Sequence, residues 1–327
     1  MAGRPLCLLA LDGGGIRGLS ELIILEEIMS RIKHDLRLDH DPLPADYFDL
    51  IGGTSTGGLI ALLLGRLRLS VREARKEYVK IAENVFSISR FLKKSKFDGA
   101  ALEASIKDVL SRHLVAEGDE AYMLDPTHSA CKVFVCSVLQ DDAGARAGPT
   151  LFRTYAVRDN ASYDCKIWEA GRATSAAPTY FDPIYIGDPG EEEIYIDGGL
   201  GYNNPVEQVL EEASRIFPGR NVDCVVSIGT GVAGVIRFPS SPKTSPFQLV
   251  HALTEMATDS DRTAERVYYQ YRNTPNVYFR FNVDRGLNGI ELDEWKNLSR
   301  SRDGAKRGEF ECHASSHGYG KWGVSPA

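Results

Sequence analysis

The chain lacks the long apolar runs and the basic excess that mark several large classes of protein. Nowhere do about 18 consecutive apolar residues occur, so no transmembrane helix is expected. The apolar run that begins at Leu6 stops at Asp12, which is too short for the apolar part of a secretion signal. The 38 Lys and Arg residues against 45 Asp and Glu residues leave a net charge of −7. This balance argues against a nucleic-acid-binding protein, which normally carries a basic excess.

Recognisable metal and disulfide patterns are also missing. None of the six cysteines belongs to a C-x-x-C pair, and Cys131 and Cys136 lie in an apolar run where a thiol acts as a small hydrophobic group. The sequence contains neither a D-x-D-x-D-G loop nor an H-E-x-x-H helix. We therefore expect no metal and no cofactor, and a reducing, cytoplasmic environment for the protein.

What the sequence does contain is an alternation of strand and helix patterns without internal repeats. Apolar residues make up 43% and charged residues 25%, as in ordinary globular domains. The predicted strands are 6–11, 47–51, 132–139, 151–157, 194–196, 222–228 and 277–283, and the predicted helices are 19–33, 59–69, 70–84 and 247–271. The alternation predicts one α/β domain over residues 1–327, with a mainly parallel central sheet flanked by helices.

Glycines gather in three short clusters, and each cluster follows an apolar run. The clusters are Gly13, Gly14, Gly15 and Gly18; Gly52, Gly53, Gly57 and Gly58; and Gly198, Gly199 and Gly201. Glycine at the end of a strand predicts a sharp turn or a close approach of the backbone to another group. Three such places predict one site at an edge of the sheet, where α/β proteins hold their ligands.

The second cluster contains the motif Gly53-Thr-Ser55-Thr-Gly57, a G-x-S-x-G between a predicted strand and a predicted helix. A nucleophile elbow requires this context, because the sharp turn lifts the serine hydroxyl out of the sheet. The alternative is a glycine-rich turn with a capping serine. We favour Ser55 as a nucleophile.

The first cluster, Asp12-Gly-Gly-Gly-Ile-Arg17-Gly18, also matches G-x-G-x-x-G. A dinucleotide site would require a second strand ending in an acidic residue about 20 positions later, whereas here the helix runs into a loop at 39–44. We favour an oxyanion hole formed by the N–H groups of Gly13, Gly14 and Gly15. Arg17 either adds positive charge there or orients the loop.

A serine nucleophile needs a base, and the third cluster supplies Asp197 at the end of a strand. The order Ser, acid, His of a triad remains possible with His251, His313 or His317. None of these histidines follows a glycine-rich strand end, so we favour a Ser55–Asp197 dyad. An ordinary Asp is a weak base at neutral pH, so the dyad requires a water-poor pocket around Asp197.

The segment 86–124 combines basic and aromatic residues, and two interpretations stay open. It could contact an anionic lipid surface, or it could be a solvated face with a few buried anchors. The residues concerned are Phe86, Arg90, Phe91, Leu92, Lys93, Lys94, Lys96 and Phe97.

Taken together and in this order, the three glycine motifs resemble the patatin-like phospholipase family. Residues 173–181, 203–205, 286–287 and 294–295 add to the resemblance, which runs from about residue 6 to residue 295. The third motif is D-G-G where many members have D-G-A. The opening residues resemble fungal patatin-like domains, which often head longer chains. The tail 315–327 is then either a linker to further domains or a natural end.

The resemblance implies a calcium-independent lipid acyl hydrolase that cleaves fatty acyl esters of phospholipids or related glycerolipids. Ser55 would be the nucleophile, Asp197 its base, and Gly13, Gly14 and Gly15 with Arg17 the oxyanion region. The implied partner is a lipid substrate at a membrane or micelle surface, bound peripherally, with no nucleic acid. The alternatives are an acyltransferase or soluble carboxylesterase with the same nucleophile, and a non-catalytic signalling module. Ser175 is interpreted as a helix-packing residue, and the sequence does not indicate an oligomeric state.

Overall fold

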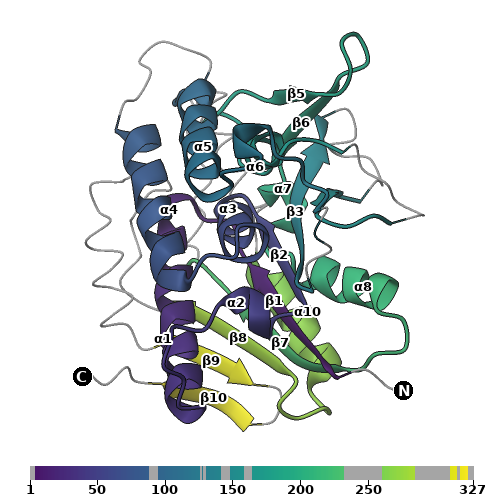
Figure 1. The fold of residues 1–327 in the computed structure, drawn as a ribbon. Coiled ribbons are helices and arrows are strands. Elements are labelled where there is room, and N and C mark those ends of the chain that lie inside the picture. The colour runs from purple at the N-terminus through teal and green to yellow at the C-terminus, as the bar shows by residue number, and fades with distance from the viewer. Residues whose placement is uncertain are drawn as a thin grey trace, which may run out of the picture.

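The centre of the molecule is a sheet in which five neighbouring strands run parallel (Figure 1). The computed structural model describes residues 4–87, 95–125, 127, 130–140, 148–157, 164–231 and 260–283, and the backbone of 310–314 and 317–322. Over these residues the strand order is β10-β9-β8-β7-β1-β2-β3-β6-β5, with β4 beside β3. Strands β8, β7, β1, β2 and β3 are parallel, and the pairings outside them are antiparallel. The predicted α/β class, with a mainly parallel sheet flanked by helices, is confirmed.

Most predicted elements are present with small changes at their ends. The strands are β1 Leu6–Leu11, β2 Leu50–Thr54, β3 Lys132–Leu139, β4 Thr150–Arg153, β5 Ile184–Ile186, β6 Glu193–Asp197, β7 Val222–Ile228, β8 Tyr278–Val283, β9 Phe310–Ala314 and β10 His317–Trp322. The α-helices are α1 Leu19–Asp35, α2 Pro44–Tyr47, α3 Thr56–Ala61, α4 Val71–Phe86, α5 Gly99–His113, α6 Ile167–Thr174, α7 Gly199–Tyr202, α8 Val206–Ile216 and α10 Ser260–Tyr271. Short 3-10 turns cover Gly15–Gly18 and Gly118–Glu120.

Two predicted elements differ from the structure, and a third lies partly outside the described residues. The strand predicted at 47–51 begins later, because Pro44 starts the short helix α2 and β2 runs through the glycines to Thr54. A Cβ atom on Gly52 would lie 2.4 Å from Phe134 Cζ, so this glycine allows close packing inside the strand instead of a turn at its end. The helix predicted at 59–69 is α3 followed by one π-helical turn, Leu62–Arg66. Of the helix predicted at 247–271, only Ser260–Tyr271 falls among the described residues.

The sheet separates two apolar cores, because alternate residues of each strand point to opposite faces. On β1, Leu9 and Leu11 pack with side chains of α1, α3, α4, α5 and α6. Leu8 and Ala10 point the other way and pack with α8 and α10. The central strands are therefore covered by helices on both sides (Figure 1).

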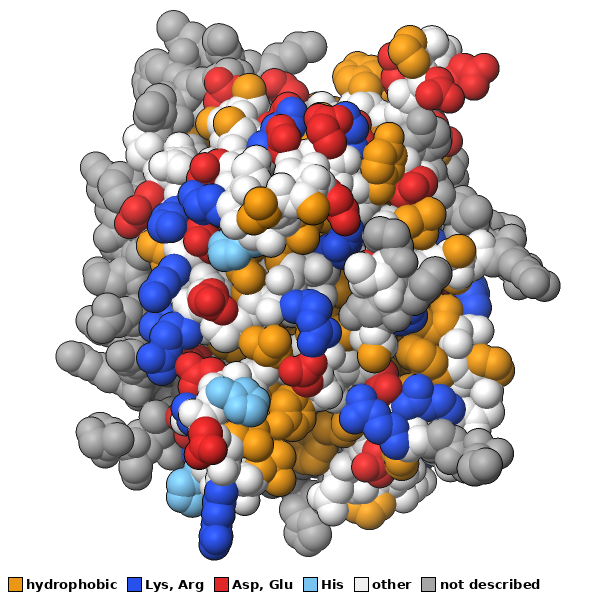
Figure 2. Space-filling model, in the orientation of Figure 1, with side chains coloured by type: hydrophobic (Ala, Val, Ile, Leu, Met, Phe, Trp, Pro, Cys, Tyr) orange, Lys and Arg blue, Asp and Glu red, His pale blue; other side chains and the backbone are white. Residues whose placement is uncertain are grey.

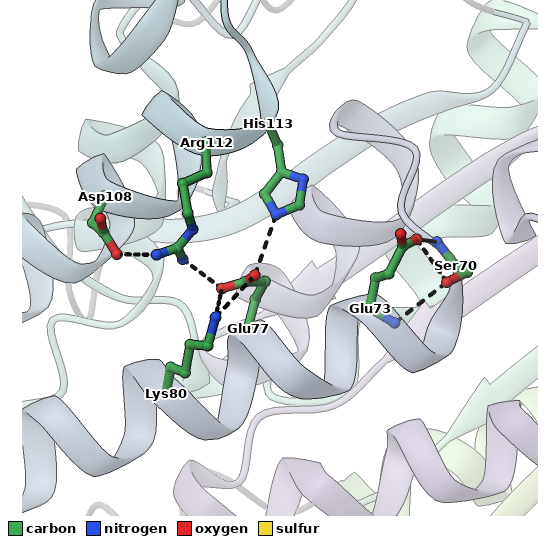
Figure 3. A network of polar contacts seen from close by, with 7 residues as sticks. All are labelled: Ser70, Glu73, Glu77, Lys80, Asp108, Arg112 and His113. Atoms are coloured by element: carbon green, nitrogen blue, oxygen red, sulfur yellow. Dashed lines mark hydrogen bonds and ion pairs between the residues drawn. The ribbon is translucent and has the colours of Figure 1, made fainter.

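Helix α4 begins at a capping box and is joined to α5 by ion pairs (Figure 3). The Ser70 hydroxyl accepts from the Glu73 N–H, and the Glu73 carboxylate accepts from the Ser70 N–H, as the sequence predicted. One turn later, Glu77 bonds both Arg112 and His113 on α5. These contacts hold α4 against α5.

The C-terminal residues form part of the sheet. The sequence shows no clear core pattern after 315, yet β9 pairs with β8 and β10 pairs with β9 in antiparallel fashion. The sheet therefore extends beyond the predicted core end near residue 295. The division into domains over 1–327 stays a prediction.

The surface of the described residues carries charges of both signs. Figure 2 shows acidic and basic side chains interspersed over the visible face, with hydrophobic side chains between them. No helix in the described part of the chain is both long and apolar enough to cross a membrane. The described cysteines, Cys7, Cys131, Cys136, Cys165 and Cys224, are free thiols.

Candidate active site

Ser55 lies between the end of β2 and the start of α3, in a backbone conformation that is rare for a side-chain-bearing residue. Its φ is 53° and its ψ is −121°, and such a conformation costs about 1–3 kcal/mol unless its surroundings hold it. The Ser55 N–H donates to Thr174 Oγ1 at 2.8 Å, and the Thr174 hydroxyl donates to the Cys136 carbonyl at 2.6 Å. The turn is therefore anchored to β3 through a buried threonine that the sequence analysis did not single out.

Gly57 brings this turn against the end of β1. Its N–H donates to the Asp12 carbonyl at 3.2 Å, and an added Cβ would lie 2.3 Å from the Leu11 carbonyl oxygen. No side chain fits there. A nucleophile elbow requires a small residue two positions after its serine. Here that residue is Gly57, and it must be small because its backbone contacts the backbone at the end of β1.

Asp197 ends β6 and is hydrogen-bonded to Ser55. The Ser55 hydroxyl donates to Asp197 Oδ2 at 2.7 Å, and the Gly199 N–H donates to Asp197 Oδ1 at 2.6 Å. The Asp197 residue is only 4% exposed. Burial raises the pKa of its carboxyl group to about 7, against the opposing effect of these two hydrogen bonds. The water-poor surroundings that a dyad requires are present, and a carboxylate of this pKa can accept a proton near neutral pH.

The register of the sheet explains why two residues so distant in sequence meet. Thr54, the last residue of β2, pairs with Cys136, and Asp197 pairs with the next residue of β3, Ser137. Strands β2 and β6 pair with opposite edges of β3, β2 running parallel to it and β6 antiparallel. Their ends therefore arrive at the same level of the sheet.

The first glycine cluster packs beside this pair, but it does not present all three N–H groups. The Gly13 N–H donates to the Asn203 carbonyl at 3.0 Å, and the Thr230 hydroxyl donates to the Gly13 carbonyl at 2.9 Å. In this structure the Gly13 N–H is therefore bonded within the protein and does not point to an oxyanion as a free donor. Gly14 and Gly15 remain as candidates.

The carbonyl groups of Gly14 and Gly15 are held by neighbouring side chains. The Tyr78 hydroxyl donates to the Gly15 carbonyl at 2.6 Å, and the Thr56 hydroxyl donates to the same atom at 3.0 Å. The Arg17 Nε donates to the Gly14 carbonyl at 3.4 Å. This contact favours the interpretation of Arg17 as a residue that orients the loop.

A buried ion pair lies at the start of the glycine loop. Both guanidinium NH₂ groups of Arg280 donate to the Asp12 carboxylate, at 2.9 and 2.6 Å, and both residues are buried. Arg280 also bonds the Ser227 hydroxyl on β7. The pair joins β1 to β8 across β7. Its two members are 268 residues apart, so no local signal in the sequence could reveal it.

An apolar cavity opens beside Ser55. It encloses about 560 Å³ of space not filled by atoms, counting the part that is open to solvent. The lining residues are Gly15, Ser55, Thr56, Leu59, Tyr78, Ile81, Ala82, Val85, Phe86, Leu102, Ser175, Ala177, Tyr180 and Phe181. Most of this wall comes from α4 and from the segment after α6.

Part of the basic and aromatic segment contributes to this wall. Phe97 is buried, its ring lies 5.1 Å from that of Phe86, and Lys96 Nζ lies 5.6 Å from the centre of the Tyr180 ring. Phe97 is therefore a buried anchor of this segment. Arg90, Phe91, Leu92, Lys93 and Lys94 lie outside the described residues.

The candidate triad histidines do not approach Ser55 where the structure describes them. His313 pairs with Arg280 of β8, so four strand spacings, about 19 Å, separate its backbone from β2. His317 belongs to β10, one strand further. His251 lies outside the described residues. Among the described side chains, no group of three or more metal-binding residue types is close enough to hold an ion.

Comparison with known proteins identifies the family of the chain. The model of the patatin-like phospholipase family matches residues 9–210. Patatin-like phospholipase 1 of Plasmodium falciparum (isolate NF54) is 29% identical over 316 residues, which cover 89% of this chain and 45% of that protein. Calcium-independent phospholipase A2-gamma of Homo sapiens is 29% identical over 313 residues, covering 90% of this chain and 37% of that protein.

The chain thus spans less than half of the length of these two relatives. Among solved structures, VipD from Legionella pneumophila is similar with a TM-score of 0.44 and 12% identity, covering 95% of this chain and 68% of that chain. The family model covers more than half of the sequence, including all three glycine clusters and Asp197. The chain belongs to the patatin-like phospholipase family.

Proposed function

We propose that this chain is a lipid acyl hydrolase with Ser55 as nucleophile and Asp197 as its base. The observation that carries the proposal is the Ser55–Asp197 hydrogen bond of 2.7 Å beside an apolar cavity. The raised pKa of Asp197 supports the role of a base, since a carboxylate that titrates near pH 7 can accept the serine proton. The names of the relatives, which are phospholipases, support a lipid substrate.

In this mechanism the Ser55 oxygen attacks the ester carbonyl carbon while its proton passes to Asp197. The N–H groups of Gly14 and Gly15 are the proposed donors to the developing oxyanion. When the bond to the alcohol oxygen breaks, the alcohol leaves with the proton, and an acyl-serine remains. Water then attacks this ester with Asp197 again as base, and the fatty acid is released.

The cavity supports an acyl chain as the group that lies beside Ser55. Four of the five α4 residues that line it, Ile81, Ala82, Val85 and Phe86, offer a chain no hydrogen-bonding side chain. The hydroxyl of the fifth, Tyr78, donates to the Gly15 carbonyl. Burial of each methylene group contributes about 0.8 kcal/mol, so a long chain would be bound far more strongly than an acetyl group. We propose that the protein binds its substrate peripherally, at the surface of a membrane or micelle, and does so without calcium.

Two measurements test this function on the same purified chain. A fluorophosphonate should label Ser55, located by mass spectrometry of the digest, and abolish the release of fatty acid from phosphatidylcholine vesicles. Ser55→Ala should show neither labelling nor hydrolysis while its circular dichroism spectrum is unchanged. Labelling at another serine, with Ser55→Ala still active, would refute the assignment. Activity confined to short soluble esters would instead favour a carboxylesterase.

A further inference from the structure

The residue that follows α6, Ser175, lies between two backbone anchors of the dyad. Its predecessor Thr174 accepts the N–H of Ser55 at 2.8 Å. Its successor Ala176 accepts the N–H of Asp197 at 3.0 Å through its carbonyl oxygen. Three consecutive residues therefore hold the nucleophile and the base, with Ser175 in the middle.

The Ser175 hydroxyl has no hydrogen-bond partner among the described residues, although the residue is only 6% exposed. Leaving a buried hydroxyl unsatisfied costs about 1–3 kcal/mol. Ser175 also lines the cavity that contains Ser55. The other buried side chains with unpartnered polar atoms, which are Glu21, Arg66, Trp168, Arg172 and Tyr278, do not line it. Packing alone, the interpretation from the sequence, does not explain a hydroxyl at this position.

Several backbone donors close to the nucleophile are already bonded within the protein. The N–H groups of Gly13, Ser55 and Gly57 donate to Asn203, Thr174 and Asp12, in that order. An ester beside Ser55 gains negative charge on its carbonyl oxygen during attack, and each missing donor lowers the rate. The Ser175 hydroxyl lines the same cavity and can supply such a donor, on the segment that also anchors Ser55 and Asp197.

We propose that Ser175 donates a hydrogen bond to the ester group of the substrate held beside Ser55. This inference rests on the proposed function, and it assigns the buried hydroxyl a direct contact with the substrate. The contact also favours one kind of ligand. A hydrogen bond from the cavity wall stabilises a bound substrate whose acyl chain carries a hydrogen-bond acceptor, such as an ester oxygen, at its end. An alkane chain without such a group would leave the hydroxyl unsatisfied.

The test compares Ser175→Ala and Ser175→Cys with the wild-type chain. For hydrolysis of phosphatidylcholine in mixed micelles, we expect Ser175→Ala to lower kcat/KM by about 10–100-fold, mainly through kcat. Ser175→Cys keeps the size and a weak donor, so its rate should fall between the two. The melting temperature of Ser175→Ala should equal or exceed that of the wild type, because an unsatisfied hydroxyl is removed.

Ser105→Ala is the matched control. Ser105 is buried to a similar extent on α5, but its hydroxyl donates to the Ala101 carbonyl at 2.8 Å, and it does not line the cavity. Its loss should leave kcat/KM unchanged. If Ser175→Ala and Ser175→Cys both hydrolyse at the wild-type rate, the hydroxyl makes no substrate contact and the inference is wrong. If the wild-type chain itself releases no fatty acid and Ser55 is not labelled, the proposed function fails, and this inference fails with it.

Discussion

Asp197→Asn should abolish hydrolysis and at the same time stabilise the fold at neutral and alkaline pH. Asparagine keeps the geometry, since its oxygen can accept from the Gly199 N–H and its NH₂ group can donate to the Ser55 hydroxyl. What it removes is the proton acceptor and the buried charge. The two effects have one cause, so both must be observed.

The magnitude follows from the pKa of Asp197, which burial raises from 3.8 to about 7 in the folded chain. Between these pH values the folded state holds a proton that the unfolded state has lost. Stability therefore falls as pH rises, by about 1.4 kcal/mol for each pH unit. Above pH 7 the charged carboxylate destabilises the fold by about 4 kcal/mol, and below pH 3.8 this contribution is absent.

Urea denaturation from pH 4 to pH 8 measures this effect. The free energy of unfolding of Asp197→Asn, relative to that of the wild type, should increase along this range and level off above pH 7. Ser55→Ala is the control, because it is equally inactive but keeps the buried carboxyl group and its pH dependence. A difference between Asp197→Asn and wild type that does not change with pH would refute the burial argument, even if activity is lost.

The remaining predictions concern the rate profile, the anchors of the site and metal ions. The kcat/KM of the wild type should fall about tenfold per pH unit below a pKa near 7, because protonated Asp197 cannot act as a base; an inflection near pH 4 would contradict this. Thr174→Val removes the acceptor of the Ser55 N–H, so kcat should drop about tenfold or more with little change in KM; unchanged kcat would show that the turn is held by other contacts. Arg280→Met leaves Asp12 buried without its partner, and urea denaturation should show a loss of about 3–5 kcal/mol; a loss below 1 kcal/mol would mean that the pair adds little. EDTA should leave hydrolysis unchanged, whereas activity that is lost on chelation and restored by calcium would reveal a metal requirement.

The sequence by itself determined the elements that depend on local patterns. Strands 6–11, 132–139 and 222–228 have the predicted bounds, because largely apolar, β-branched runs are typical of central parallel strands. The capping box at Ser70 was equally readable, since its two partners are three residues apart. The G-x-S-x-G motif indicated a strand–serine–helix turn, and that turn is present around Ser55.

Only the tertiary structure decided which groups around the turn are available for chemistry. Nothing near Gly13 in the sequence indicates that its N–H is bonded to Asn203, and nothing near Ser55 indicates Thr174. The C-terminal strands β9 and β10 were missed because they pair in antiparallel fashion, and antiparallel strands need no continuous apolar run. The register of β2 and β6 on β3, which brings Ser55 to Asp197, is a property of the whole sheet. Local patterns in the sequence indicate strands, helices and turns. Hydrogen bonds between residues more than a hundred positions apart form only when the strands pair, so these patterns do not predict them.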